Sequence, residues 1–143
     1  MDSRPVPGVD MVVDLNVLPW PWGDSTVDFI AALDSLEHLY PLGRVEGQLN
    51  IVAILSEVWR VLKPGGVMYA RIPSTDGRGA FQDPTHVTYW NRNTWWYFDA
   101  RSEIHPPDWP AFETSLGDEN SHEEGIKWVL VKAVKVEYPP PKG

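Results

Sequence analysis

Runs of apolar residues predict β-strands at residues 9–15, 28–33 and 67–72. The run from Phe29 to Leu33 is continuously apolar rather than alternating, which is typical of a strand covered on both faces in a parallel sheet. A further run, over residues 126–136, predicts the last strand of the chain. Residues 16–24 are predicted to form a loop, because Pro19 and Pro21 remove backbone donors and restrict their neighbours.

The clearest helix is predicted over residues 46–62. Its apolar residues recur at helical spacing on one face, namely Ile51, Leu55, Val58, Trp59 and Leu62. Glu57 and Arg60 are expected to point away from that face, and Pro64-Gly65-Gly66 ends the helix. The order of strand 28–33, this helix and strand 67–72 predicts a right-handed parallel crossover, hence an α/β fold.

Shorter elements fill the remaining sequence. Residues 36–39 predict a helical turn, and Asn93-Thr94 offers a helix cap ahead of the aromatic residues 95–98. Residues 74–88 are predicted to be a polar loop, and residues 103–125, rich in proline and acidic side chains, to be irregular. We therefore expect a single domain over residues 1–138, followed by a proline-rich tail at 139–143.

Composition narrows the classes of partner. The 143 residues carry a formal net charge of −8, which disfavours binding to the phosphates of nucleic acids. The chain has no cysteine, which excludes disulfides and a thiol nucleophile. No apolar run approaches the roughly 18 residues that span a membrane, and the first residues lack a secretion signal, so we expect a cytoplasmic protein without a membrane partner. The eight tryptophans fit either core packing or an aromatic binding surface.

Polar side chains follow three of the predicted strands. They are Asp14, then Asp34 and Ser35, then Ser74 and Thr75. Carboxylates and hydroxyls at adjacent strand ends suit a small polar ligand in the crevice above the sheet. Ordinary solvated loop residues explain the same pattern, and the sequence does not decide between the two interpretations.

Other kinds of site are less well supported. Glu37, His38, Asp83 and His86 offer the ligand types of a two-histidine carboxylate metal site, but they lie in two separate loops without helical ligand spacing. We therefore predict no metal site. The sequence contains no Gly-x-Ser-x-Gly, no Gly-x-Gly-x-x-Gly and no phosphate-binding P-loop, which disfavours nucleophilic hydrolysis and the usual nucleotide-binding turns.

Six motifs occur in a fixed order along the chain, namely Asp14-Leu15, Leu18–Pro21, Asp24–Asp28, Leu36–Leu39, Glu57–Gly66 and Asp83–His86. Together they resemble a known family, the class I S-adenosylmethionine-dependent methyltransferases, specifically the group called methyltransferase type 11. The resemblance covers roughly residues 9–100.

The resemblance assigns roles to individual residues. It implies that Asp14 and Leu15 lie near the adenine of S-adenosylmethionine, and that Asp34 and Ser35 face its methionine end. His86, on a loop where the acceptor would approach, is the first candidate for a catalytic base or substrate contact, followed by Asp34 and Glu37. For Glu37 and His38, capping and bracing of the turn is the alternative role.

The chain also departs from the family pattern. The glycine-rich cofactor turn after the first strand has no counterpart here, and by comparison Asp2 occupies the position of the ribose-binding acid. The resemblance thus implies a partial Rossmann-like fold, mostly parallel with an antiparallel C-terminal strand, whose first strand and first helix are missing. In the family's strand order, 3-2-1-4-5-7-6, this leaves residues 28–33 with an unpaired edge, which is unfavourable for buried backbone groups.

Two arrangements would cover that edge. Residues 9–15 could pair beside residues 28–33, or two chains could associate there as a homodimer. For function, the resemblance implies transfer of a methyl group from S-adenosylmethionine to a small-molecule acceptor by in-line displacement. The alternatives are a non-catalytic remnant that serves as a binding or assembly module, and a fragment of a longer protein.

Overall fold

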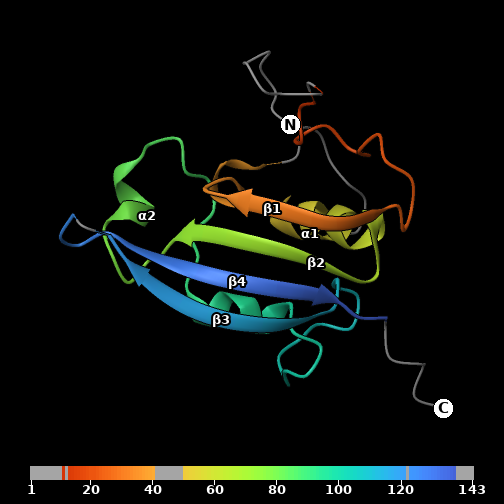
Figure 1. Ribbon diagram of the computed structural model, residues 1–143. Helices are drawn as coiled ribbons and strands as arrows, with labels where there is room; N and C mark the ends of the chain where they lie inside the picture. Colours follow the sequence, from red (N-terminus) through yellow and green to blue (C-terminus); the bar gives the residue numbers. More distant parts are fainter. Residues whose placement is uncertain (1–10, 12, 41–49, 122, 138–143) are drawn as a thin grey trace.

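Four strands and four short or medium helices make up the part of the chain that is described. The computed structural model describes residues 11, 13–40, 50–121 and 123–137. The elements, labelled in Figure 1, are β1 (Val27–Leu33), η1 (Leu36–His38), α1 (Asn50–Val61), β2 (Leu62–Pro73), α2 (Gly79–Gln82), η2 (Arg92–Tyr97), β3 (Phe112–Asn120) and β4 (Lys127–Lys135).

The strands form one sheet in the order β1-β2-β4-β3 among the described residues. β1 and β2 are parallel, while β4 is antiparallel to both of its neighbours (Figure 1). This order matches strands 4-5-7-6 of the arrangement that the resemblance implies. The prediction of an α/β fold with an antiparallel C-terminal strand is therefore confirmed.

β3 corrects the prediction that residues 103–125 are irregular. Every residue of this strand pairs with β4, from Phe112 opposite Lys135 to Asn120 opposite Lys127. Its own sequence is mostly polar and includes Gly117, and only Phe112 and Thr114 are of the aromatic and β-branched types that identify strands. The apolar strand beside it, rather than local preference, holds β3 in place.

The predicted strand at residues 9–15 is not formed in its described part. Residues 11 and 13–15 adopt no strand, and residues 9, 10 and 12 lie outside the described residues. Asp14 instead begins a turn, because its backbone oxygen accepts from the Val17 N–H at 3.1 Å and its carboxylate from the Asn16 N–H at 3.0 Å. Within the described chain, β1 pairs with β2 and with no other strand.

Helix α1 ends where predicted, but the turn after it is part of a strand. Residues 46–49 of the predicted helix lie outside the described residues. β2 already begins at Leu62, and its pairing with β1 jumps from Leu62 opposite Val27 to Val67 opposite Phe29. Residues 63–66 therefore form a bulge, in which Gly65 adopts φ +76° and a Cβ on Gly66 would lie 2.8 Å from the Lys63 oxygen.

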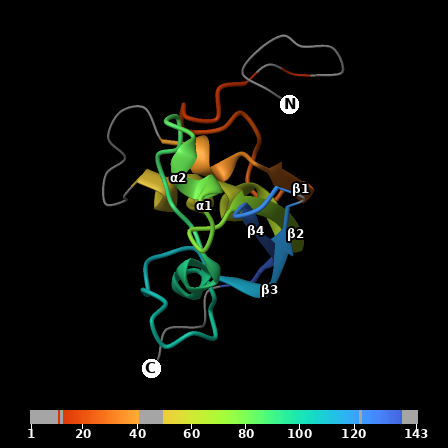
Figure 2. The same cartoon turned by 90° about the vertical axis from the view of Figure 1, so that its left-hand side faces the viewer.

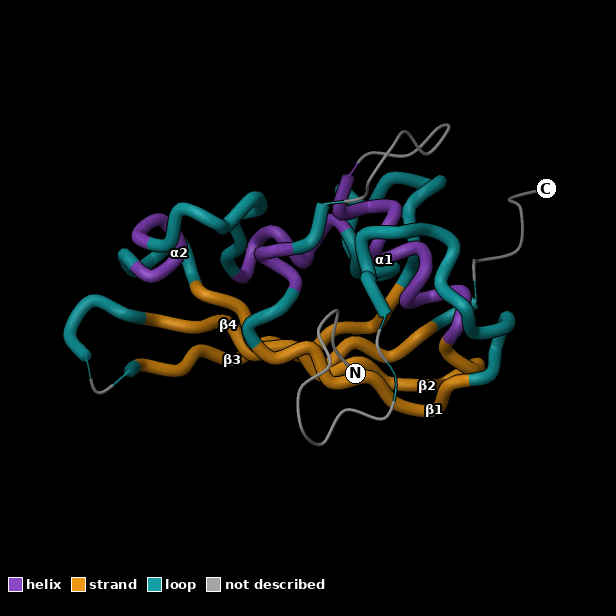
Figure 3. Tube along the Cα trace, turned by 90° about the horizontal axis from the view of Figure 1, so that it is seen from above, coloured by secondary structure: helices purple, strands orange, loops and turns teal. Residues whose placement is uncertain are grey.

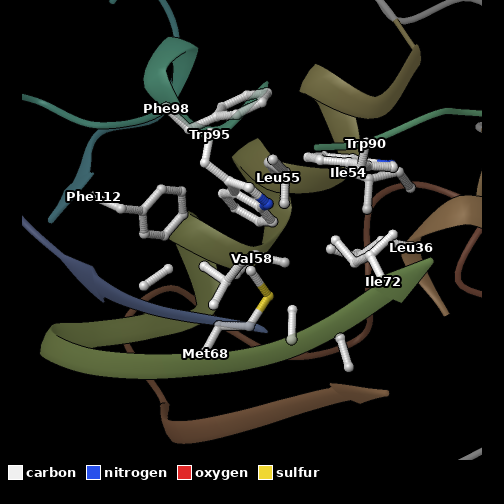
Figure 4. Close-up of a cluster of buried hydrophobic side chains, with 14 of the residues drawn as sticks. Leu36, Ile54, Leu55, Val58, Met68, Ile72, Trp90, Trp95, Phe98 and Phe112 are labelled. Carbon is white, nitrogen blue, oxygen red and sulfur yellow. The ribbon is translucent and has the colours of Figure 1, made fainter. Parts of the chain in front are cut away.

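All helices cover the same face of the sheet (Figure 2). Figure 4 shows the resulting core, in which Leu55 and Val58 of α1 lie with Met68 and Ile72 of β2. Trp20, Trp90 and Trp95 are also buried, which favours core packing for these tryptophans. Within residues 11, 13–40, 50–121 and 123–137, no helix has the length and apolar character needed to cross a membrane.

The opposite face of the sheet is open in the described chain. Phe29 of β1 is 55% exposed and Tyr69 of β2 is 42% exposed, with ring centroids 5.4 Å apart. The expectation that β1 is covered on both faces is therefore wrong for the described residues. Figure 3 shows the one-sided arrangement from above, with the helices of the described residues on one side of the strands.

The aromatic segment before β3 begins with a capping box. Asn91, not Asn93 as predicted, is the N-cap of η2. Its side chain accepts from the backbone N–H groups of Asn93 and Thr94, while the Thr94 hydroxyl accepts from the Asn91 N–H at 3.0 Å. Trp95 is thereby directed into the core.

A buried carboxylate joins this segment to β3. Asp99 accepts from the Thr114 N–H and hydroxyl at 3.0 and 2.8 Å and from the Arg101 guanidinium at 2.8 Å. Burial opposes the charged form, but these hydrogen bonds outweigh it and hold the pKa of Asp99 well below its ordinary range. The folded state therefore favours the ionised carboxylate more strongly than the unfolded state does.

Replacing Asp99 by asparagine is expected to destabilise the fold by about 2 kcal/mol at pH 7. Because the folded pKa is the lower one, this stabilisation is present above the unfolded pKa of about 3.9 and is lost as the pH falls below it. Urea unfolding at pH 7 and pH 3 should show the difference between parent and variant shrinking at pH 3. Asp118→Asn, at an exposed ion pair with Arg92, should cost less than about 0.5 kcal/mol at pH 7. An Asp99→Asn effect equally large at pH 3 would contradict this account.

Candidate functional site

The carboxyl ends of β1 and β2 lie at the same end of the sheet, close to α2 (Figure 1). Asp34 and Ser35 follow β1, and Ser74 and Thr75 follow β2. This is the edge where ligands bind in open α/β sheets. The strand ends predicted from the sequence are thus brought together at one place.

Asp34 is tied to the sheet. Its carboxylate accepts from the Trp128 Nε1–H at 3.0 Å and from the Arg71 guanidinium at 2.5 Å. The Arg71 guanidinium in turn lies 5.0 Å from the centre of the Trp128 ring, and its hydrogen bond to Asp34 raises the pKa of Arg71. Both oxygens of Asp34 are engaged, and its backbone is held at φ +52°. These contacts favour a bracing role, so a catalytic role for Asp34 stays a prediction.

Ser35 faces a pocket of about 410 Å³ beside β1. Leu15 lines the same pocket, together with apolar side chains of β1, of α1 and of the loop before β1, among them Trp20, Trp22, Ile30 and Val58. The structure therefore brings together two of the residues that the resemblance assigns to the cofactor. Asp14 is exposed next to this pocket without lining it, and Asp2 lies outside the described residues.

Ser74 and Thr75 do not line this pocket. Ser74 is buried and its hydroxyl accepts from the Asp76 N–H at 3.1 Å, while the Thr75 hydroxyl accepts from the Asn91 amide at 3.0 Å. Both side chains are thus used to hold the start of the loop after β2. The pocket is therefore lined from β1, α1 and the loop before β1, and not by the residues that follow β2.

A second group of polar side chains lies where η1 meets the loop at residues 83–88. Glu37 and His38 come from η1, and Asp83, Thr85 and His86 come from the loop. Backbone hydrogen bonds join the two segments, since the backbone oxygen of Glu37 accepts from the Val87 N–H at 2.8 Å. The imidazole rings of His38 and His86 consequently lie 4.8 Å apart, edge to face.

Glu37 is the least expected member of this group. It is 1% exposed, and neither carboxylate oxygen has a hydrogen-bond partner within the described structure. Burial raises the pKa of Glu37, and the nearby His38 opposes that rise. Capping of the turn is therefore wrong for Glu37, because η1 has no side-chain cap.

The loop side of the group is well ordered by hydrogen bonds. The backbone N–H and the hydroxyl of Thr85 donate to Asp83 at 2.9 and 2.7 Å and lower the pKa of Asp83. The Thr85 hydroxyl also lies 3.1 Å from Nδ1 of His38, which supports a bracing role for that histidine. His86 is buried, with Nδ1 2.9 Å from the Ala80 oxygen.

Some residues of the site are not predicted from the sequence. Trp128, which binds Asp34, is distant in the chain and is brought there by the pairing of β2 with β4. Arg71 offers a clue, because a charged residue within the apolar run 67–72 implies an anionic partner on one face of the strand. Thr85 connects the two segments and could be identified only after they are seen together.

Comparison with known proteins points to one family. Residues 3–70 match the family described as Methyltransferase domain. No curated protein matches the chain significantly.

Two solved structures resemble the fold. One is a chain of the complex between the Haloferax volcanii Trm112 methyltransferase activator and a protein assigned as a methyltransferase. It is 13% identical with a TM-score of 0.54, over 89% of this chain and 61% of that one. The other is a protein of Bacillus halodurans C-125 assigned as a methyltransferase, 15% identical with a TM-score of 0.54, over 91% of this chain and 74% of that one.

The chain thus spans less than two thirds of the first of these structures. The sequence match covers β1, α1 and most of β2, while the structural likeness covers 89% and 91% of the chain. Taken together, residues 3–70 are similar in sequence to a methyltransferase domain, and the fold is similar to two proteins assigned as methyltransferases.

Proposed function

We propose that the chain takes part in the transfer of a methyl group from S-adenosylmethionine to a small-molecule acceptor. The observation that carries this proposal is the pocket beside β1, where Leu15 and Ser35 meet. Its apolar walls suit the flat face of an adenine, and Ser35 supplies a hydrogen-bonding group. In this proposal Asp14, at the pocket's rim, and Asp2 are further candidates for the cofactor.

The chemistry asks little of the protein beyond alignment. The acceptor atom attacks the methyl carbon in line with the sulfonium, the new bond forms as the carbon–sulfur bond breaks, and the sulfur keeps the electron pair. A base is needed only when the acceptor must lose a proton. His86 is the first candidate for that base, with Glu37 and Asp34 behind it.

Titration calorimetry with S-adenosylhomocysteine tests the proposal. We expect micromolar binding by the parent chain, and an affinity at least about tenfold lower for Leu15→Asp, because a carboxylate would be buried against the ligand. Val17→Asp is the matched control, since Val17 is 51% exposed in the same loop and does not line the pocket. Circular dichroism checks that both variants are folded.

The alternative function, a non-catalytic binding or assembly module, is favoured by the edge of β1, which pairs with β2 and with no other described strand, and by the exposed Phe29 and Tyr69 on the open face of the sheet. The partner that we propose in that case is a second copy of the chain, bound along the free edge of β1. Absence of S-adenosylhomocysteine binding at millimolar ligand, together with a dimer in sedimentation velocity, would replace the first proposal by this one. A monomer that binds the ligand would reject the alternative.

A further inference from the structure

Three side chains with metal-binding atoms converge at the junction of η1 and the loop at 83–88. One ligand atom each from Glu37, His38 and His86 lies within 4.8 Å of the other two. From the sequence alone we predict no metal site, because these residues lie in separate loops. The hydrogen bond from the Val87 N–H to the backbone oxygen of Glu37 answers that objection, because it fixes the one segment against the other.

The hydrogen bonds around the two imidazoles determine which nitrogen is left to bind. The Ala80 carbonyl can only accept, so Nδ1 of His86 donates to it and Nε2 keeps the lone pair. The Thr85 hydroxyl gives its proton to Asp83 and therefore accepts from Nδ1 of His38. In their neutral forms both histidines thus present Nε2 as a ligand, held by the kind of outer hydrogen bond that orients metal-binding histidines.

Glu37 supplies the independent observation. Its carboxylate is 1% exposed and has no donor within the described structure, although Oε1 lies only 3.6 Å from Nε2 of His38. Burial of a carboxylate without a donor or a cation is costly. An unpaired buried carboxylate with an imidazole nitrogen of each histidine within 4.8 Å therefore calls for a positive charge beside it.

We propose that Glu37, His38 and His86 bind one divalent transition-metal ion, with Zn²⁺ as the ion that fits best. Two imidazoles and one carboxylate select Zn²⁺ or a similar ion over Mg²⁺ and Ca²⁺, which prefer oxygen ligands. At Zn–ligand distances of about 2.1 Å, tetrahedral ligand atoms lie about 3.4 Å apart, so the three side chains close by roughly 1.5 Å at most. Three protein ligands leave a position for water or for an oxygen of an acceptor.

The inference adds a role to His86 but does not depend on methyl transfer. If methyl transfer takes place here, the ion would polarise the acceptor oxygen, and His86 would hold the ion instead of removing the proton. Metal binding is a property of this chain by itself. A positive binding result and a failed cofactor titration can therefore coexist, and each proposal can fail alone.

Binding of Zn²⁺ to the purified, metal-free chain tests the site. We expect one Zn²⁺ per chain with a dissociation constant of about 1 μM or tighter, and no binding of Mg²⁺ at the same concentrations. Glu37→Gln and His86→Asn should each weaken Zn²⁺ binding at least about 100-fold, and Thr85→Val, which removes the acceptor for His38, about tenfold. His105→Asn is the control, because His105 bonds the Pro110 oxygen away from the site, and it should bind as the parent does.

Thermal unfolding keeps the test valid if a variant loses stability. Zn²⁺ should raise the melting temperature of the parent and of His105→Asn, but not of Glu37→Gln or His86→Asn. The competing explanation is an imidazolium of His38 paired with Glu37 without any metal. Absence of Zn²⁺ binding by the parent, or binding that persists unchanged in Glu37→Gln and His86→Asn, would overturn the proposal.

Discussion

Replacing Trp95 by alanine is expected to lower the free energy of unfolding by about 4 kcal/mol. The side chain is 0% exposed, and its ring centroid lies 4.9 Å from that of Trp90 and 5.9 Å from that of Phe98. Alanine would leave a cavity at the centre of the core in Figure 4, where the surrounding aromatic rings are themselves held by their neighbours. Urea unfolding followed by circular dichroism measures the loss.

Trp95→Phe separates packing from hydrogen bonding at this position. The indole N–H of Trp95 has no partner within the described structure, so phenylalanine removes an unsatisfied donor while it keeps an aromatic ring. We expect Trp95→Phe to cost about 1 kcal/mol and Trp96→Ala, at a 48% exposed neighbour, less than about 0.5 kcal/mol. Equal losses for Trp95→Phe and Trp95→Ala would show that the indole N–H is bonded after all.

Replacing Glu57 by alanine is expected to cost about 3 kcal/mol, because it leaves the buried Trp20 N–H without an acceptor and removes the carboxylate that lies against Arg60. Glu57 accepts from the Trp20 N–H at 2.8 Å and from the Arg60 Nε–H at 2.6 Å, and these bonds fasten the loop before β1 to α1. The Glu57 hydrogen bond is also the main cause that raises the pKa of Arg60. Urea unfolding and the fluorescence of the loop tryptophans report the loss.

Asp24→Ala is the matched control for this network. Asp24 binds the same guanidinium at 2.8 Å, but its side chain is 80% exposed, so the pair is screened by water. We expect Asp24→Ala to cost less than about 1 kcal/mol. A similar cost for both substitutions would mean that burial of Glu57 contributes nothing to its effect.

The elements with strong apolar patterns could be predicted from the sequence. β1, η1, α1 and β4 lie close to their predicted positions. The apolar face of α1 and the apolar runs of β1 and β4 are visible in the sequence itself. β3 could not be predicted, because its stability comes from pairing with β4 and not from its own residues. Glu57 is a similar case. It lies outside the apolar face of α1, and the loop before β1 buries it, which the periodicity of the helix could not predict.

The candidate site could be predicted only in part. Residue types at strand ends identified Asp34 and Ser35, and the resemblance identified Glu37 and His86, but which of them meet depends on long-range contacts. Ser35 and Leu15 line the same pocket beside β1. Glu37 and His86 are brought near each other by a backbone hydrogen bond between η1 and the loop at 83–88. The carboxylate of Glu37 shows why such contacts matter, because its burial turns a polar turn residue into a metal ligand in our proposal.

The bulge at residues 63–66 also determines which side chains of β2 point into the core. Between two paired positions, β1 advances by two residues, from Val27 to Phe29, while β2 advances by five, from Leu62 to Val67. Side chains alternate between the two faces of a strand. Two residues of β1 return to the same face, whereas five residues of β2 end on the other face, so the β2 residues that pair with the outward residues of β1 change at the bulge. Deleting a single glycine here would turn Met68 and Ile72 toward the open face and Tyr69 toward the core. The length of this short segment thus decides which half of β2 becomes interior.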